Sequence, residues 1–243
     1  MKKNYEMDMC SGPILGKLLT FTIPLIFSGI LQLLFNAADV IVVGRFAGSQ
    51  SLAAVGSTTA LINLMINIFI GLSVGVNVIV ARYYGAKREK DVQDTIHTAM
   101  ALSIVSGLFL IIVGQLLSRP MLELMGTPDD VIDKSTIYMR IIFIGMPANM
   151  IYNFGSAILR AVGDTKRPLY FLTAAGVINV VLNLFFVIMF QMDVAGVALA
   201  TAISQAISAC LVILCLMESE GGLKLHLKDL KIHRSKFRQI IQV

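Results

Sequence analysis

Six long stretches of this chain contain no charged side chain, and they limit its fold more than any other feature. The stretches cover residues 18–38, 46–81, 95–118, 141–159, 168–192 and 194–217. A helix needs about 20 apolar residues to cross a bilayer, because each residue adds only ~1.5 Å along the helix axis. Backbone polar groups inside a bilayer must bond internally, and a helix satisfies that need within one segment. We therefore predict an all-α membrane protein built as a bundle of six transmembrane helices.

The composition supports this prediction. Only 14% of the 243 residues are charged, and 56% are hydrophobic. Soluble domains average about 25% charged residues. The segments between the apolar stretches are short, so no soluble domain is expected. The first stretch runs well past the length of a signal-peptide core without a small-residue cleavage site, and we expect it to remain as a membrane helix.

The positive charges predict the orientation of the helices. If the N-terminus is cytoplasmic, all but four of the 20 Lys and Arg residues lie on the inner side. The four on the outer side are Arg45, Arg119, Lys134 and Arg140. Cytoplasmic loops carry an excess of Lys and Arg in most membrane proteins. The net charge of +5 is therefore assigned to orientation and to contact with anionic membrane lipid, and nucleic-acid binding is excluded as a function.

Three regions follow from this pattern. Residues 1–13 form a cytoplasmic N-terminus, and residues 14–217 form a lobe of six helices. The expected helices cover about 14–43, 52–83, 95–117, 135–159, 168–192 and 194–217. Residues 218–243 alternate basic and apolar side chains, which predicts a cytoplasmic amphipathic linker on the inner membrane face. We expect a kink at Pro24 in the first helix, because a proline ring removes a backbone donor and clashes with the preceding turn.

One carboxylate, Asp39, interrupts the first apolar helix. An acidic side chain near the bilayer centre costs roughly 2.5–3.5 kcal/mol on insertion scales. A site facing lipid would not tolerate that cost without a partner or a water-filled cavity. Ionisable side chains inside membrane helices usually belong to paths for ions, protons or substrates. Asp39 thus favours transport as the function.

Other polar residues recur at helical spacing and form stripes on several helices. They are Gln32, Asn36 and Asp39 on the first helix, Asn153 on the fourth, Asn179 and Asn183 on the fifth, and Thr201 on the sixth. Asp39, Asn179, Asn183 and Thr201 fall at similar depth in the outer half of the bilayer. A carboxylate, two amides and a hydroxyl at one depth suit Na⁺ or a proton relay. Such stripes also often serve only to hydrogen-bond helices together, so a structural role remains open.

Taken in order along the chain, several short motifs resemble one family over roughly residues 13–243. They are Pro24; Gln32 with Asn36 and Asp39; Val43-Gly44-Arg45; Leu52-Ala53-Ala54-Val55-Gly56; Leu159-Arg160-Ala161-Val162-Gly163-Asp164-Thr165-Lys166; Asn179 with Asn183; and Gly196-Val197-Ala198-Leu199-Ala200-Thr201. The chain resembles the N-terminal lobe of a multidrug and toxic compound extrusion (MATE) transporter. The resemblance implies a multi-pass protein of the bacterial plasma membrane with two six-helix lobes, twelve helices in all.

The resemblance also implies an activity, which is export of amphipathic organic cations in exchange for H⁺ or Na⁺. It implies no cofactor beyond that coupling ion. It assigns the coupling cation to Asp39, Asn179, Asn183 and Thr201, with Na⁺ as one candidate. The polar stripes themselves predict that Gln32, Asn36 and Asn153 line the cavity. Many family members carry a second Asp where this chain has Asn183, so only one titratable group is expected here.

The chain ends where a second lobe is expected to begin, so we expect the missing C-terminal lobe or a second chain as a partner. Two other functions stay open. A non-transporting membrane fragment or scaffold would be identified by a reading frame that stops at Val243. A lipid-linked oligosaccharide flippase of the wider superfamily would need basic residues inside the spans to hold a diphosphate, and the spans contain none apart from residues near their ends. The spans contain no pair of a nucleophile and a base, so an enzyme is disfavoured.

Overall fold

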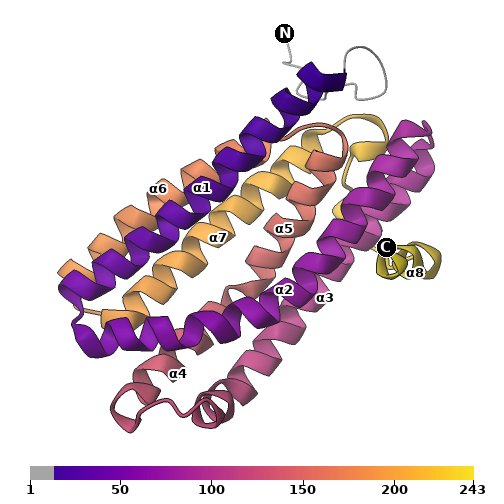
Figure 1. The fold of residues 1–243 in the computed structure, drawn as a ribbon. Coiled ribbons are helices and arrows are strands. Elements are labelled where there is room, and N and C mark those ends of the chain that lie inside the picture. The colour runs from indigo at the N-terminus through magenta and orange to yellow at the C-terminus, as the bar shows by residue number, and fades with distance from the viewer. Residues whose placement is uncertain (1–13) are drawn as a thin grey trace.

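The computed structural model describes residues 14–243, which are helical with no β-strand in that range (Figure 1). The helices are α1 (Ile14–Phe46), α2 (Ser49–Gly85), α3 (Glu89–Leu124), α4 (Asp129–Ile144), α5 (Met146–Ala161), α6 (Lys166–Leu184), α7 (Asp193–Glu218) and α8 (Arg234–Gln242). A π-helical turn at Phe185–Met189 continues α6, and 3₁₀ turns at Gly221–Leu223 and Leu227–Asp229 lie between α7 and α8. The predicted cytoplasmic N-terminus, residues 1–13, lies outside the described residues.

Five helices, α1, α2, α3, α6 with its π-helical turn, and α7, are each long and apolar enough to cross a membrane. The α4–α5 pair also qualifies when its two helices are taken together as one bent span. With that pair included, the described residues hold the six spans that the charge-free stretches predicted. The all-α membrane fold is confirmed.

The fourth predicted span is bent rather than straight. The axes of α4 and α5 meet at 48°, and the break falls at Gly145. Pro147 lies in the first turn of α5, where its missing N–H costs least. The Gly145 N–H bonds to the carbonyl oxygens of Ile141 and Ile142, at 3.3 and 3.0 Å, and so closes α4 with a tightened turn.

Pro24 lies inside α1, which continues as one helix on both sides of it. The hydroxyl of Ser28 donates to the carbonyl oxygen of Pro24 at 2.9 Å. Serine side chains inside a helix often donate to the carbonyl oxygen four residues earlier in this way. The kink at Pro24 stays a prediction.

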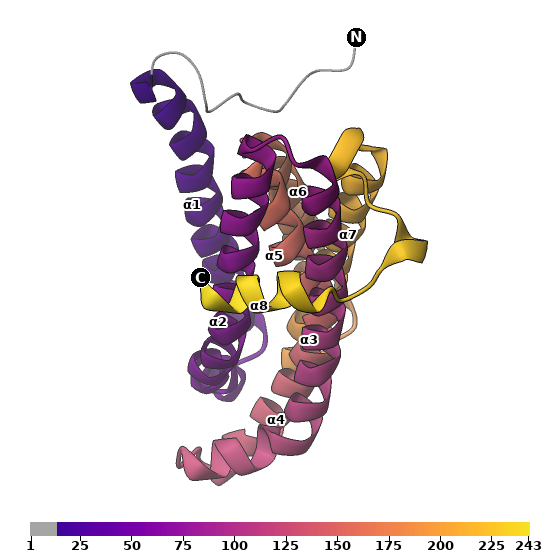
Figure 2. The same cartoon turned by 90° about the vertical axis from the view of Figure 1, so that its right-hand side faces the viewer.

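The helices enclose an interior with α1 and α6 along one side and α2 and α3 along the other (Figures 1 and 2). α3, α4, α5 and α7 pack closely against one another. Phe143 of α4 and Met150 and Phe154 of α5 are fully buried among them. α1 differs, because most of its large apolar side chains are exposed, including Leu15 and Leu33 at 71% each. That surface suits lipid or another protein element.

Polar contacts tie the helices together at both ends of the bundle. At the predicted outer end, the Lys134 ammonium lies 2.6 Å from the Asp193 carboxylate and donates to the Ser51 hydroxyl at 3.0 Å, joining α2, α4 and α7. At the opposite end, the buried Asp164 carboxylate accepts the backbone N–H groups of Lys166 and Arg167 at 3.2 and 3.1 Å. Asp164 thereby satisfies donors that the first turn of α6 would otherwise leave free.

Candidate functional site

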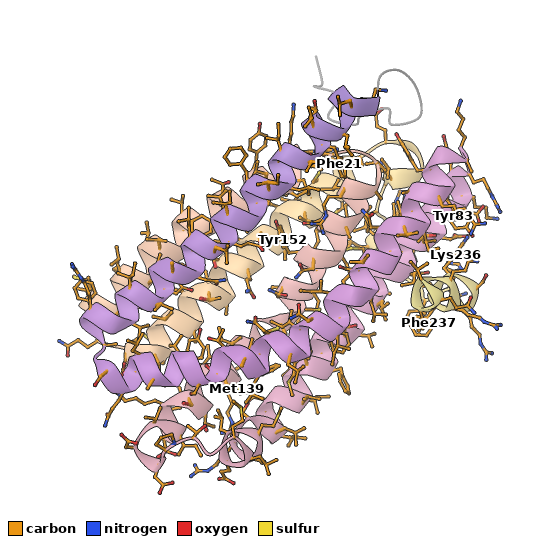
Figure 3. All side chains as sticks on the ribbon, viewed as in Figure 1. Phe21, Tyr83, Met139, Tyr152, Lys236 and Phe237 are labelled. Atoms are coloured by element: carbon orange, nitrogen blue, oxygen red, sulfur yellow. The ribbon has the colours of Figure 1, made fainter. Side chains whose placement is uncertain are left out.

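A cavity of about 410 Å³ opens inside the bundle and is lined by α1, α2, α4, α5, α6 and α7. Its polar lining residues are Gln32, Asn36, Asp39, Thr59, Asn63, Asn149, Asn153, Asn179, Thr201, Ser204, Gln205 and Ser208, together with Tyr138 and Tyr152. Figure 3 shows Tyr152 in the space between the two sides of the bundle. The polar stripes of different helices therefore face one common space, while the opposite faces of those helices are apolar.

At one wall of the cavity, four side chains from α1, α6 and α7 form a continuous chain of hydrogen bonds. The Asn183 amide donates to the Asp39 carboxylate and, at 3.2 Å, to the side-chain oxygen of Asn179. The Asn179 amide in turn donates to the Thr201 hydroxyl at 3.2 Å. Thr201 ends the chain by donating to the backbone oxygen of Val197 at 2.9 Å.

Two of these side chains differ in their access to the cavity. Asp39 lines it, whereas Asn183 is fully buried behind the wall and is not among its lining residues. The side-chain oxygen of Asn183 is buried and has no hydrogen-bond partner. Buried polar atoms are rarely left unpaired. Asn183 therefore donates to Asp39 while its own side-chain oxygen is left without a hydrogen bond.

The structure brings together all four residues predicted to couple the cation. It also places Gln32, Asn36 and Asn153 on the cavity wall, as the stripes predicted. The Asn153 amide is engaged within its own helix, donating to the side-chain oxygen of Asn149 at 2.8 Å. Pro24 does not line the cavity.

The sequence reasoning missed two tyrosines. Tyr138 and Tyr152 both line the cavity, and the Tyr152 hydroxyl donates to the Pro168 carbonyl at 3.1 Å. Tyrosines in an apolar span are usually interpreted as packing residues. A signal did exist for Tyr138, because it precedes Asn149 by three helical turns and so shares the face of that polar residue.

The charged lining of the cavity is acidic. Among residues 14–243, Asp39 is the one acidic residue that lines the cavity, and no Lys or Arg side chain lines it. A carboxylate at the wall of a low-dielectric cavity attracts a cation strongly, because protein and lipid screen its field poorly. The arrangement can hold a proton on Asp39, a small cation between oxygen atoms, or an organic cation in the cavity.

Comparisons with known proteins agree with this fold. The MatE family model matches residues 24–185. A probable multidrug resistance protein of Bacillus subtilis (strain 168), YoeA, is 35% identical over 188 residues, covering 76% of this chain and 41% of the relative. A second from the same organism, YpnP, is 31% identical over 201 residues, covering 83% and 45%. A FAD transporter of Shewanella oneidensis is 27% identical over 208 residues, covering 84% and 46%.

Solved structures give the same result. A MATE transporter in its bent conformation superposes with a TM-score of 0.86 at 25% identity, covering 93% of this chain and 51% of that one. A MOP superfamily transporter from Pyrococcus furiosus superposes with a TM-score of 0.85 at 25% identity, covering 93% and 50%. The chain thus spans about half the length of the relatives and structures that it matches.

Proposed function

The chain belongs to the MatE family, and from that premise we propose that it forms the first lobe of an antiporter that exports amphipathic organic cations in exchange for H⁺ or Na⁺. One observation carries the proposal. Asp39, the single acidic residue of the cavity lining, lies within a chain of polar side chains from three helices. Cavities of this kind hold ligands by a few placed polar groups among apolar walls.

In the proposed cycle, Asp39 exchanges an ion for the substrate. While Asp39 is charged, the cavity attracts an organic cation. When Asp39 takes up a proton or Na⁺, that attraction is lost and the hydrogen-bond chain with Asn183 rearranges. A bound ion shifts the balance between two states only through its different affinity for each. Rocking of two lobes about such a site would release the substrate outward.

The hydrogen bonds favour H⁺ over Na⁺ as the coupling ion. The Asn183 amide already occupies one oxygen of Asp39 and the side-chain oxygen of Asn179. Na⁺ needs several oxygen ligands, and at this site the Asn183 amide presents its N–H donors, not its oxygen, to Asp39 and Asn179. A proton needs only one carboxylate oxygen, and Asp39 has two.

The cavity also favours a cationic substrate. The family includes a relative named as a FAD transporter, and a lipid-linked diphosphate is the substrate expected of a flippase. Either substrate is an anion that Arg or Lys side chains would hold. No such side chain lines this cavity.

The test is drug efflux from membrane vesicles with the protein expressed from its complete reading frame. Asp39→Asn keeps the size of the side chain and removes its charge, so gradient-driven efflux should fall to the background of vesicles without the protein. The control is Asp130→Asn, because Asp130 is exposed at the start of α4 and far from the cavity lining. Undiminished efflux by Asp39→Asn would remove Asp39 from the coupling role.

A further inference from the structure

All three histidines of the chain lie at one contact, where the linker (residues 218–243) folds back on the N-terminal end of α3. His97 lies in α3 and is 4% exposed. His226 and His233 lie in the linker. The rings of His97 and His226 stack with their centres 6.2 Å apart. Nothing in the transport proposal uses this cluster.

The hydrogen bonds of His97 define its protonation state. Its Nδ1 lies 2.9 Å from the Gln93 carbonyl oxygen, which can only accept, so Nδ1 carries the hydrogen. Its Nε2 lies 3.1 Å from the backbone nitrogen of His226, which can only donate, so Nε2 is a bare acceptor. With both nitrogens engaged in this way, the docked linker requires a neutral His97.

We propose that the linker is a pH-sensitive latch on the N-terminal end of α3, closed by neutral His97 and released when that ring takes up a proton. Protonation places a hydrogen on Nε2, where it opposes the His226 N–H. The bond is lost, and the backbone donor of His226 has no partner left. The undocked linker lets His97 bind its proton freely, so acidification favours the open state.

The surrounding groups determine the pH range. The titratable and charged residues that α2, α3 and the linker contribute to this contact are Tyr83, Arg88, Glu89, Asp91, Asp94, His226, His233 and Lys236. Of the side-chain types in this set, only histidine has an ordinary pKa between 5.5 and 7.5. A second proton on the His226 ring would repel a charged His97 and so act in the same direction.

One pair opposes release. The His233 Nε2 lies 3.7 Å from the Asp94 carboxylate, and protonation of His233 would strengthen this contact. Both side chains are about one-third exposed, at 37% and 31%. Water screens such a pair and leaves it weak. The buried His97 bond therefore decides the direction.

A second anchor should hold through the pH change. The Lys236 ammonium lies 2.6 Å from the Asp91 carboxylate and 3.8 Å from the centre of the Tyr83 ring, and it is 6% exposed. The Tyr83 hydroxyl donates to the Gln239 side-chain oxygen at 2.7 Å. Figure 3 shows Tyr83 and Lys236 together at the contact of α8 with α2. None of these groups normally titrates between pH 5.5 and 7.5. The latch should thus open between residues 223 and 233 while α8 stays docked.

Amide hydrogen exchange tests the latch in the protein expressed from its complete reading frame and held in lipid nanodiscs. The quantity is the protection factor of the His226 amide, which corrects for the pH dependence of intrinsic exchange. One proton taken up only in the open state predicts a protection factor about tenfold lower at pH 5.5 than at pH 7.5. The amides of α8 should keep their protection.

Three variants separate the causes. In His97→Gln the side chain can still accept a hydrogen bond but cannot titrate, so the His226 protection factor should change less than twofold with pH. In His233→Gln the tenfold change should remain. In Gly222→Ala the new Cβ would lie 2.7 Å from the Glu89 carbonyl oxygen, so protection should be lost at both pH values. Protected amides around Leu110, in the core of α3, report that each variant is folded.

The proposal is overturned if the wild-type protection factor does not fall with pH, if His97→Gln keeps the full change, or if His233→Gln abolishes it. The readout is amide exchange rather than efflux. The latch is therefore decided separately from the transport function, and a failure of either one leaves the other in place.

Discussion

At the scale of single residues, Asn183 is the most constrained side chain of the site. Its amide donates to two acceptors while its own oxygen is buried without a partner. A buried acceptor left unpaired costs about 1–3 kcal/mol. Asn183 tolerates this cost because a charged Asp39 demands a donor. A neutral Asp39 could donate instead, and the amide could then turn its oxygen toward it.

This reasoning predicts the effect of Asn183→Asp on ion selectivity. The substitution replaces the donor to Asp39 by carboxylate oxygens, so two acids would share one buried site. Two such groups repel unless a cation lies between them. We expect Na⁺ gradients to stimulate efflux by the variant, measured as dye efflux from vesicles with and without Na⁺, whereas wild-type efflux should respond to pH alone.

Asn183→Leu is the matched control for that prediction. It removes the same donor and adds no charge, so it should impair efflux without any response to Na⁺. Equal stimulation of wild type, Asn183→Asp and Asn183→Leu by Na⁺ would contradict the role given to Asn183.

Helical spacing and depth in the bilayer together predicted that Asp39, Asn179, Asn183 and Thr201 lie close together. Asp39, Asn179 and Thr201 lie on the cavity wall because each shares a polar helix face that cannot face lipid. Spacing did not predict that Asn183 is buried behind the wall, since it gives the face of a helix and not the distance from a cavity. Tyr138 was missed because its ring is apolar and only its hydroxyl is polar.

At the scale of elements, the contact of α3 with α5 is very close. A Cβ at Gly107 would overlap the backbone of Pro147 next to the α4–α5 bend. We expect Gly107→Ala to cost about 1–3 kcal/mol, because overpacking forces the helices apart. Thermal unfolding in detergent, followed by loss of helical circular dichroism, measures the change.

Gly71→Ala is the comparison for Gly107→Ala. Gly71 also lies inside a long helix, α2, but a Cβ there would meet no atom within 4 Å. Alanine has the higher helix propensity, so this variant should be neutral or more stable. A Gly107→Ala protein as stable as Gly71→Ala would show that α3 and α5 can separate without cost.

Sequence patterns located the elements better than their ends. The expected helices over 52–83 and 95–117 left a connection of residues 84–94, yet α3 begins at Glu89 and the loop is short. Glu89 and Asp91 lie in the first turn of α3, where the helix dipole favours acidic side chains. The break at Gly145 was also missed. Pro147 lies inside the predicted span, but a proline in a sequence can either bend a helix or begin a new one.

At the scale of the whole molecule, the orientation in the membrane remains a prediction from charge. Labelling with a membrane-impermeant maleimide tests it, in a background with Cys10, Cys210 and Cys215 changed to Ser. Lys90→Cys, at the start of α3, should react only in inside-out vesicles. Asp130→Cys, at the start of α4, should react only in right-side-out cells. The reverse pattern would place the N-terminus outside.

The all-α membrane fold could be predicted because six charge-free stretches are visible in the sequence alone. The docking of the linker could not be predicted. Its basic residues suggested contact with lipid, whereas Lys236 is buried against Asp91 and Tyr83. A buried partner of a lysine comes from a distant segment, and spacing along one helix cannot identify it.

α3 contributes no side chain to the cavity, although it is one of the longest helices and packs closely against α5. Natural substitutions should therefore have one of two consequences, depending on where they lie. Substitutions along the buried face of α3 will change how much protein survives quality control in the cell. Under the proposed export function, changes in the range of compounds that a host withstands will arise on the six helices that line the cavity.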